Sequence, residues 1–373
     1  MAFGKEDVLS VSGEYGVINQ IAFQGRSFAG ESVADYHVVE TDDIVYTKSP
    51  LKANPYGIIK VNKGIPGIVS TLYAVYHPLN TVAPRFVDLY FANDLRLNKF
   101  LKPLVNIGAK HDMKVNNSFV LTGTVVFPSI GEQQKLVDFF AKLDRRIEAQ
   151  RKIVDTLKKY KRGVFEAVFS RKLRLIPKAR QSDWTAFKLG DFATRITRKN
   201  NGATDIPLTI SAQYGLIDQR NFFSKVVASS DMSGYYLLRK GEYAYNRSTS
   251  NDYPFGSIKR LELYDEGAVS TLYLCFAIKE DVVLSDYAKW YFESSQWHRA
   301  INEICAEGAR NHGLLNVPTD GFFDTVHILP SDIEEQTQIA AFLSRVHDKL
   351  AKAQEELNKL IGLRNGLMQQ LFI

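Results

Sequence analysis

The sequence has little cysteine and no long apolar run. Its two cysteines, Cys275 and Cys305, are too few for a framework of disulfides. No apolar stretch reaches the roughly 18 residues that a membrane-spanning helix needs. The acidic Glu6 and Asp7 stand where a secretory signal would have its apolar core. These absences argue against a disulfide-rich secreted protein and an integral membrane protein, and they favour a reducing, cytoplasmic location without membrane contact.

The common signatures of catalysis and metal binding are absent as well. The histidines form no HExxH motif and no ligand spacing with either cysteine, and the chain has neither a GxxxxGK nor a GxGxxG phosphate loop. No Ser/His/Asp or paired-carboxylate pattern rises above background. Asn54-Pro55-Tyr56 and Asp252–Phe255 superficially resemble the Asn/Asp-Pro-Pro-aromatic motif of amino-methyltransferases but lack its paired prolines. We therefore expect no catalysis, no metal and no cofactor in this chain.

What the sequence does contain is a composition typical of folded proteins, with an excess of positive charge. Hydrophobic residues make up 45% and charged residues 24% of the 373 positions, which excludes wholesale disorder. A chain of this length exceeds one ordinary core and predicts at least two domains. The net charge of +6 suggests an anionic partner.

The strongest pattern is an internal repeat. SGEYGVINQ (Ser12–Gln20) returns as SAQYGLIDQ (Ser211–Gln219), 199 residues further on. Other pairs follow in the same order with small shifts: DDIVYTKSP (42–50) and GEYAYNRST (241–249), PYGIIK (55–60) and PFGSIK (254–259), GIVSTLY (67–73) and GAVSTLY (267–273), GAKH (108–111) and GARN (308–311), FPSIGEQQKLVDFF (127–140) and LPSDIEEQTQIAAFL (329–343). Such ordered matches indicate two copies of one unit. The Asn54 and Asp252 segments fall at matching places, which favours a shared turn.

Each copy has the pattern of an irregular β-rich globule followed by a long helix, so the predicted fold class is α+β with an internal pseudo-two-fold repeat. Short β-branched and aromatic runs, such as Ile44–Tyr46 and Val69–Tyr76, predict strands. Shorter helices are expected at Ser285–Gln296 and, from a weaker pattern, at Phe86–Phe100.

Two long amphipathic helices follow the globules. Apolar residues recur with heptad spacing; Gln150 and Lys161 interrupt the first stripe, and Arg364 takes the place of Lys161 in the second. About 40 residues make a rod of roughly 60 Å, which a single core does not need. Ordinary amphipathic packing is the alternative, but two matched stripes favour an antiparallel coiled coil. The predicted helix-pair interface comprises Leu136, Phe140, Leu143, Ile147, Leu157, Ile339, Leu343, Val346, Leu350 and Leu360.

These patterns predict four segments. Residues 1–129 and 176–330 form the two globules, the second with its linker, and residues 130–175 and 331–373 form the long helices that separate them. Between Glu132 and Arg180, fifteen Lys and Arg residues stand against six Asp and Glu residues. A solvated helix face explains such a charge run, and so does a rod lying near phosphate or docked on an acidic partner.

Two similar globules suit a partner that presents two sites at a fixed distance, as duplex DNA does about every 34 Å. The copies differ most in the segments where base-reading side chains are expected, whereas frame residues such as Ser70–Tyr73 persist. Arg247 is a candidate for a bidentate contact with guanine. The predicted DNA contacts are Lys48, Lys52, Asn54, Lys110, His111, Asn246, Arg247, Asn251, Arg310 and Asn311.

Four features of the duplicated pattern carry a family resemblance. They are the paired units, the helix starts at Pro128–Gln133 and Pro330–Gln336, the Gly108 and Gly308 turns, and the Trp followed by Leu-Gly in Trp184–Ala193. With these features, the chain resembles the DNA-specificity subunit of type I restriction–modification enzymes. The resemblance spans essentially the whole chain.

The resemblance implies two target-recognition domains that read the halves of a bipartite double-stranded DNA target, with antiparallel helices that set their spacing. It also implies docking of two modification subunits, which would bring S-adenosylmethionine, and of restriction subunits, which would use ATP. Catalysis and cofactors would then belong to those partners. A non-catalytic coiled-coil scaffold that tethers two protein-binding modules is the alternative.

The first copy departs from the pattern at its front. Met1 aligns near Asn200, so residues 184–199 have no counterpart in the first copy. Three apolar residues of that segment are expected to anchor it to the second globule: Leu189, Phe192 and Ile196. We therefore expect the first globule either to be less stable than the second or to be covered by another segment, with Leu367–Ile373 as the candidate cover.

Overall fold

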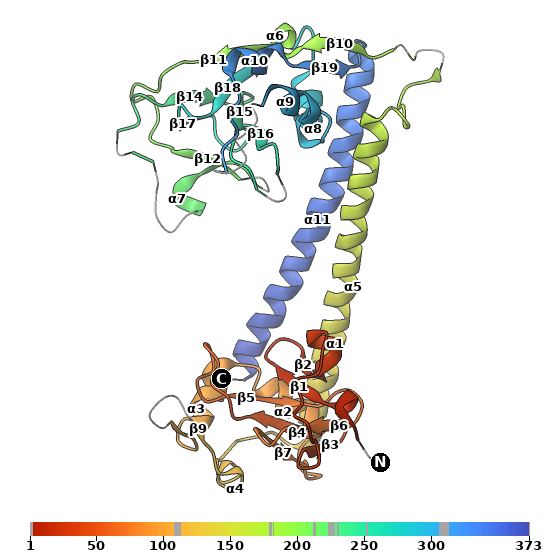
Figure 1. The fold of residues 1–373 in the computed structure, drawn as a ribbon, viewed down its shortest axis with the longest axis vertical. Helices are drawn as coiled ribbons and strands as arrows, with labels where there is room; N and C mark the ends of the chain where they lie inside the picture. The colour runs from red at the N-terminus through yellow and green to blue at the C-terminus, as the bar shows by residue number, and fades with distance from the viewer. Residues whose placement is uncertain are drawn as a thin grey trace. The chain divides into compact units, whose positions relative to one another are not determined.

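The computed structural model describes residues 3–107, 113–178, 181, 183–211, 214–222, 228–229, 231–250, 253–305 and 313–372. The described chain combines short strands and helices with two long helices, which confirms the α+β class (Figure 1). It divides into two compact units: unit 1 is Met1–Ile153 with Gln354–Ile373, and unit 2 is Val154–Ala353. Each unit contains one globule and part of both long helices, whereas the limits expected from the sequence lie at the helix ends.

The globule of unit 1 is built from short elements. In chain order they are the 3₁₀ helix η1 (Lys5–Asp7), β1 (Leu9–Ser12), β2 (Gly16–Asn19), α1 (Gln20–Gln24), β3 (His37–Val39), β4 (Ile44–Thr47), β5 (Ile58–Val61), β6 (Gly67–Val69), β7 (Tyr73–Tyr76), α2 (Pro84–Tyr90), α3 (Asp94–Leu101), β8 (Asn106–Ile107), β9 (Met113–Lys114) and α4 (Asn117–Val120).

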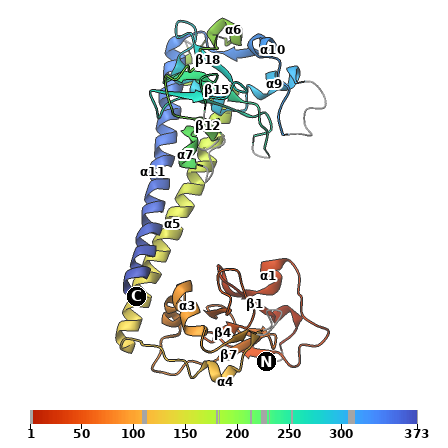
Figure 2. The same cartoon turned by 90° about the vertical axis from the view of Figure 1, so that its left-hand side faces the viewer.

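The strands of unit 1 form small antiparallel sheets (Figure 2). β5, β4 and β7 make a three-stranded sheet in that order, β1 pairs with β2, and β3 pairs with β6. In the central sheet, Tyr46 lies opposite Ile59 on β5 and Ala74 on β7. These residues share a buried apolar core with Val87 of α2 and Leu101 of α3. The helices therefore cover one face of the sheet.

Unit 2 contains a second globule. Its elements are β10 (Thr185–Lys188), α6 (Leu189–Phe192), β11 (Ala193–Ile196), β12 (Leu208–Ser211), β13 (Gly215–Asp218), α7 (Gln219–Phe222), β14 (Tyr236–Arg239), β15 (Tyr243–Asn246), β16 (Ser257–Arg260), β17 (Glu266–Val269), β18 (Leu274–Ile278), α8 (Ser285–Glu293), α9 (His298–Ile304), α10 (Thr319–Asp324) and β19 (Val326–Leu329).

The core of unit 2 is rich in aromatic side chains. A four-stranded sheet has the order β11, β18, β15, β16, and the pairs β10–β19, β12–β13 and β14–β17 surround it. Tyr243 stacks on Phe276 with ring centroids 5.3 Å apart, and Tyr245 stacks on Phe322 at 5.1 Å. All four side chains are buried. Such aromatic pairs add specific geometry to the burial that stabilises the sheet.

The two globules repeat each other element by element, as the sequence predicts. β4 corresponds to β15 and β5 to β16, each 199 residues apart, and α2, α3 and α4 correspond to α8, α9 and α10. Two local predictions are wrong. Val69–Tyr76 is not one strand, because a turn in which Tyr73 N–H donates to Ser70 O at 3.0 Å separates β6 from β7. Phe86–Phe100 is two helices, because the Asn93 side chain caps the start of α3.

Unit 2 has a front segment that the described part of unit 1 lacks. It comprises β10, α6 and β11, and β10 pairs with β19, which also has no strand counterpart among the described residues of unit 1. Leu189, Phe192 and Ile196 are 0%, 1% and 8% exposed. This burial confirms that they anchor the segment to the globule.

The long helices are α5 (Ile130–Phe169) and α11 (Ile333–Leu371). α5 ends before residue 175, where the sequence suggested its end. Arg171 adopts a left-handed backbone conformation with φ 65°, and Leu173 N–H donates to Ala167 O at 2.9 Å. Such a closure is typical of helix C-termini. Within the described chain, no helix is long and apolar enough to cross a membrane.

In unit 1, the two long helices lie side by side and run antiparallel (Figures 1 and 2). The Phe140 and Phe372 ring centroids are 6.1 Å apart. One turn further along α5, Asp144 Oδ1 accepts a hydrogen bond from Arg364 Nε at 2.5 Å. Residue numbers thus rise along α5 as they fall along α11.

The same direction holds within unit 2. Lys161 Nζ lies 3.3 Å from His347 Nδ1, and Arg174, just after α5, forms a bidentate ion pair with the buried Glu335 at 2.5 and 2.9 Å. Among the residues expected at the helix interface, seven are buried and three are partly buried. The buried ones are Phe140, Leu143, Ile147, Ile339, Leu343, Val346 and Leu360; the others are Leu136, Leu157 and Leu350.

A buried glutamine joins each globule to the start of its long helix. Gln133 accepts a hydrogen bond from Ala83 N–H at 2.9 Å, just before α2, and its amide donates to Pro128 O at 2.9 Å. Gln336 accepts the equivalent bond from Leu284 N–H at 2.7 Å, just before α8. The first backbone N–H groups of a helix lack intrahelical partners. The glutamine of each Glu-Gln helix start therefore holds the beginning of its long helix against the globule.

Candidate nucleic-acid interface

The two globules share a hairpin loop at corresponding places, at residues 48–57 between β4 and β5 and at residues 247–256 between β15 and β16. The described backbones of the two loops have the same hydrogen bonds. Leu51 and Asn54 exchange backbone bonds of 3.0 and 3.1 Å in unit 1, and Ser250 and Tyr253 exchange bonds of 3.2 and 3.1 Å in unit 2. The shared turn predicted from the sequence is therefore confirmed.

Glycine and tyrosine fix the end of each loop. Gly57 has φ 88° and Gly256 has φ 76°, a region that favours glycine. A Cβ on Gly57 would lie 2.0 Å from the carbonyl oxygen of Thr47, so no other residue fits there. The hydroxyl groups of Tyr46 and Tyr245 donate to the loop backbone at 2.6 and 2.9 Å. Two different sequences are thus held in one frame.

In unit 1, the loop carries two of the predicted DNA contacts in accessible positions. The Lys52 side chain is exposed, and Lys48 is partly buried. Lys48 Nζ donates to Asn117 Oδ1 of α4 at 3.4 Å, and burial lowers the pKa of Lys48. Asn117 was not among the predicted contacts, because a partner 69 residues away leaves no signal in the sequence.

The DNA contact predicted for Asn54 does not fit the structure. It is only 8% exposed, and its side-chain amide donates to Asp94 Oδ1 at 3.0 Å. Asn98 of the same helix, α3, donates to Ala53 O at 3.0 Å. Asn54 therefore ties the loop to α3 and is not placed to read a base. The Asn54-Pro55 pair lies in a turn, and the Asn54 side chain is buried there because it bonds α3.

Arg247 and Asn246 also serve the loop itself. The Arg247 guanidinium donates to Leu272 O at 3.0 Å and to Val317 O at 3.3 Å. A guanidinium bound to two backbone carbonyls does not have its fork free for guanine, so the bidentate role predicted for Arg247 does not fit the structure. Asn246 Oδ1 accepts from Ser248 N–H at 3.0 Å, a local turn contact.

The remaining predicted contacts lie outside the described residues: Lys110, His111, Asn251, Arg310 and Asn311. Their flanks are described. β8 and β9 pair on either side of residues 108–112. Thr249 N–H donates to Gly313 O at 2.7 Å, so the loop of unit 2 adjoins the residues that follow 306–312.

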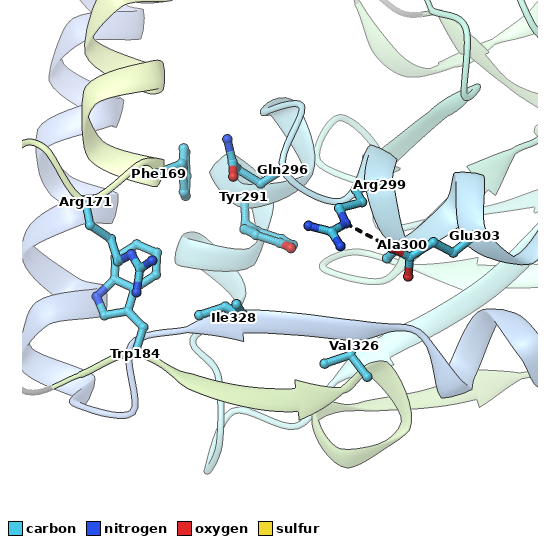
Figure 3. A pocket seen from close by; sticks show the side chains of 10 residues that line it. All are labelled: Phe169, Arg171, Trp184, Tyr291, Gln296, Arg299, Ala300, Glu303, Val326 and Ile328. Carbon is cyan, nitrogen blue, oxygen red and sulfur yellow. Dashed lines mark hydrogen bonds and ion pairs between the residues drawn. The ribbon is translucent and has the colours of Figure 1, made fainter.

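No group of three or more His, Cys, Asp and Glu residues in the described chain could hold a metal ion. A pocket of about 370 Å³ lies in unit 2 beside the end of α5 (Figure 3). Phe169, Trp184 and Tyr291 line it with aromatic rings, and Arg299 pairs with Glu303 at 2.9 Å. The pocket lies where the residues that follow α5 contact the globule.

No protein-family model and no curated protein sequence matches the chain. Solved structures do match. The S subunit of the type I restriction-modification system from M. genitalium is 13% identical, with 100% of this chain and 92% of that chain covered and a TM-score of 0.53. The HsdS subunit from Thermoanaerobacter tengcongensis is 14% identical, with 92% and 83% covered and a TM-score of 0.47. A chain from a structural study of complex assembly and conformational transition of the type I R-M system is 15% identical, with 92% and 84% covered and a TM-score of 0.47.

The similarity to the M. genitalium subunit spans both units and both long helices. The chain therefore has the fold of a type I restriction–modification specificity subunit. At 13% identity, this likeness concerns the fold and not individual side chains.

Proposed function

We propose that the chain is the DNA-specificity subunit of a type I restriction–modification enzyme, a non-catalytic protein in which each globule reads half of a bipartite target. The observation that carries this proposal is the pair of hairpin loops with one backbone pattern and different side chains. A common frame with different side chains suits two readers of different half-sites. The fold shared with the M. genitalium S subunit supports the same function.

In this proposal, the loops contribute in two ways. Lys48 and Lys52 supply phosphate contacts in unit 1, which position the globule on the duplex. The exposed Ser248 and Ser250 of unit 2 offer hydroxyl groups in the corresponding loop. Arg247 positions its loop through the backbone and does not read a base.

The long helices would set the spacing between the half-sites and dock two modification subunits, which in turn recruit restriction subunits. S-adenosylmethionine and ATP would bind to those partners. Exposed basic residues of α5 suit docking on an acidic partner surface; they include Lys135, Lys142, Arg145, Lys159 and Arg162.

The proposal is tested with the full chain assembled with its modification subunits. Affinity for random duplex DNA is expected to fall steeply with salt, because phosphate contacts release counterions. Sequencing of methylated bases in cells that carry the system should reveal one bipartite target. A shallow salt dependence together with no chain-dependent methylation would refute the proposal and favour a protein-binding scaffold.

A matched pair of variants connects the test to the loop. Gly57→Ala forces the loop of unit 1 to rearrange, whereas Gly64→Ala has a negative-φ backbone and only an ordinary 3.5 Å contact. Gly57→Ala should reduce recognition of one half-site, and Gly64→Ala should not. Equal effects of the two variants would show that the loop of unit 1 does not take part in recognition of the half-site.

A further inference from the structure

An exposed tyrosine recurs at the same place in the two globules. Tyr15 lies in the turn between β1 and β2, and Tyr214 lies 199 residues further on, just before β13. The two residues are 60% and 59% exposed. Packing within the globule does not account for either ring, because more than half of each residue is open to solvent.

The same local frame holds both tyrosines. Ser12 Oγ accepts a hydrogen bond from Tyr15 N–H, and Ser211 Oγ accepts one from Tyr214 N–H, each at 3.2 Å. The glycine that follows each tyrosine has a positive φ, 73° in unit 1 and 81° in unit 2, in a region that favours glycine. Serine, tyrosine and glycine are identical in the two copies. The frame therefore presents a tyrosine to solvent at one matched point of each unit.

An exposed leucine recurs as well. Leu72 follows β6 and Leu272 follows β17, both within the sequence Ser-Thr-Leu-Tyr. They are 64% and 60% exposed. The turn closes with the same backbone bond in both units, between the N–H of its tyrosine and the carbonyl of its serine, at 3.0 and 3.1 Å. The closure of the turn needs only the backbone, so the leucine side chain is not explained by it.

In unit 1, the two turns lie at the end of the globule that carries the hairpin loop. Val8, just before β1, forms a parallel bridge with Ile68 of β6. The two strands therefore run in one direction, and the turns that follow them lie at the same end. Lys48 N–H donates to Leu72 O at 3.2 Å. Leu72 thus adjoins the first residue of the loop at 48–57.

Unit 2 has the same arrangement. Pro207, just before β12, forms a parallel bridge with Ala268 of β17, and the Arg247 guanidinium donates to Leu272 O at 3.0 Å. Each unit therefore carries an exposed tyrosine and an exposed leucine at the end of the globule where its hairpin loop begins. We call these residues the repeated pair: Tyr15 and Leu72 in unit 1, Tyr214 and Leu272 in unit 2.

The repeated pair and the hairpin loops suit different parts of a DNA duplex. Seven of the ten positions differ between residues 48–57 and 247–256, whereas the tyrosine and the leucine are identical. Half-sites of different sequence present different base edges but the same sugar–phosphate backbone. Side chains that are the same in both units therefore suit the part of the duplex that is the same in both half-sites.

The chemistry of the repeated pair suits an uncharged contact. Its turns, 12–16, 70–73, 211–215 and 270–273, contain no lysine or arginine, and the first contains Glu14. They therefore do not neutralise phosphate charge. A tyrosine hydroxyl can still donate a hydrogen bond to a phosphate oxygen, and a leucine can pack against the apolar edge of a deoxyribose. Such contacts add affinity without releasing counterions, so they do not steepen the salt dependence of binding.

We propose that the repeated pair makes a sequence-independent, uncharged contact with the sugar–phosphate backbone, once in each half-site. The contact holds the duplex against the hairpin loop that reads it. This inference rests on the proposed function and deepens it, because it separates the residues that hold the duplex from those that distinguish bases. Continuity with the hairpin loop favours the duplex over a protein partner as the occupant of this surface.

The test uses the full chain assembled with its modification subunits, and duplexes of cognate and random sequence. Two double variants remove the repeated pair: Tyr15→Ser with Leu72→Ser, and Tyr214→Ser with Leu272→Ser. Each should weaken binding to both duplexes about tenfold. The two variants should lose affinity by similar factors, because the contact is the same in both units. The ratio of cognate to random affinity should not change.

Matched controls come from the opposite end of each sheet. Ile65 and Leu263 are 75% and 63% exposed and follow β5 and β16, whereas the hairpin loops precede those strands. Ile65→Ser and Leu263→Ser should leave DNA affinity unchanged. Lys52→Gln is the ionic comparison and should reduce the slope of log affinity against log salt by about one, which the double variants should not do. Hydrogen exchange at β4, β5, β15 and β16 verifies that each variant is folded.

The outcomes separate this inference from the proposed function. An unchanged assembly that neither binds nor methylates DNA refutes the proposed function and this inference with it. If the unchanged assembly binds and methylates DNA, the inference alone is overturned when the double variants bind as tightly as the controls, or when they change preference at a single base pair. Loss of a modification subunit from the double variants, seen by analytical ultracentrifugation, would identify a protein and not the duplex as the occupant.

Discussion

Lys161 and His347 occupy in unit 2 the places that Arg364 and Asp144 occupy in unit 1. Lys161 Nζ lies 3.3 Å from His347 Nδ1, whereas Arg364 Nε donates to Asp144 Oδ1 at 2.5 Å. The helix pair of one unit thus contains an ion pair where the other contains a cation beside an imidazole. Burial, Lys161 and Lys289 lower the pKa of His347. The repeat preserves the position of a polar contact but not its charge.

Replacing His347 by Asp should therefore stabilise unit 2. The new carboxylate would pair with Lys161, as Asp144 pairs with Arg364, and a partly exposed pair of this kind contributes about 0.5–1 kcal/mol. Urea unfolding followed by tryptophan fluorescence measures it, because Trp184, Trp290 and Trp297 are all in unit 2. A lower unfolding midpoint for His347→Asp at pH 7.5 would contradict the expected pairing. The converse variant in unit 1, Asp144→His, should lose stability.

Unit 2 should also lose stability as the pH falls. His327 is 3% exposed, with Tyr291 Oη at 2.9 Å from one ring nitrogen and Thr325 Oγ1 at 2.8 Å from the other. Burial lowers its pKa from 6.5 to about 4. The unfolded chain then binds a proton below pH 6.5 that the folded chain binds only near pH 4. Stability is therefore full above pH 6.5 and falls by about 2 kcal/mol between pH 7.5 and pH 5.

The measurement is the urea midpoint of unit 2 at the two pH values. His327→Gln removes the titrating group and should make the dependence shallower by about 2 kcal/mol, even if the variant is less stable at both pH values. His298 and His347, whose pKa values are also lowered, would leave a residual slope. An unchanged slope in His327→Gln would show that His327 does not titrate as its burial implies.

Two kinds of feature were predictable from the sequence: segments that occur twice along the chain, and helices with a regular spacing of apolar residues. The matched segments identified the two copies, and heptad spacing located a helix start at Ile130, because apolar periodicity is local information. The anchors Leu189 and Phe192 were predicted from the unequal fronts of the copies and are buried. In these cases, one residue type in a regular pattern was enough.

Side-chain direction was not predictable in the same way. Arg247 and Asn54 have the residue types of base readers, yet the structure uses them to hold their loops, because polar residues next to turns often satisfy backbone or buried groups. The partners involved, such as Leu272 and Asp94, are distant in sequence, so composition and spacing contain no trace of them. Residue type alone therefore did not separate a reader from a support.

Gln133 should be essential for the stability of unit 1. Gln133→Ala leaves the N–H of Ala83 and the carbonyl of Pro128 without their partners, at a cost of about 1–3 kcal/mol. Gln134→Ala is the matched control, because Gln134 is exposed and bonds only Asp138 on the same helix face. Hydrogen exchange at β4 and β5 follows unit 1 specifically. Equal protection in both variants would contradict a role for Gln133 in holding α5 against the globule of unit 1.

Arg247→Ala distinguishes positioning from reading. If Arg247 only positions its loop, the variant should bind all variants of its half-site more weakly by a similar factor, with unchanged base preference. The loss of two bonds from a charged donor should also lower the stability of unit 2 by about 1–3 kcal/mol. Methylated-base sequencing and competition binding measure preference. Relaxed preference at a single base pair, with stability unchanged, would instead identify a base reader.

The last prediction concerns the long helices as a spacer. Seven residues inserted after Gln150 in α5, with seven inserted in α11 near Gln354, preserve the heptad stripe and lengthen both helices by about 10 Å. Because base pairs rise about 3.4 Å along duplex DNA, the unread gap of the bipartite target should grow by about three base pairs, with both half-sites unchanged. Insertion in α5 alone is the control, because it shifts the apolar stripe of α5 out of register with the stripe of α11. This variant should abolish methylation. Methylated-base sequencing of cells carrying the complete system reads the gap directly. A double insertion that methylates the original spacing would show that the helices do not set the distance between the half-sites.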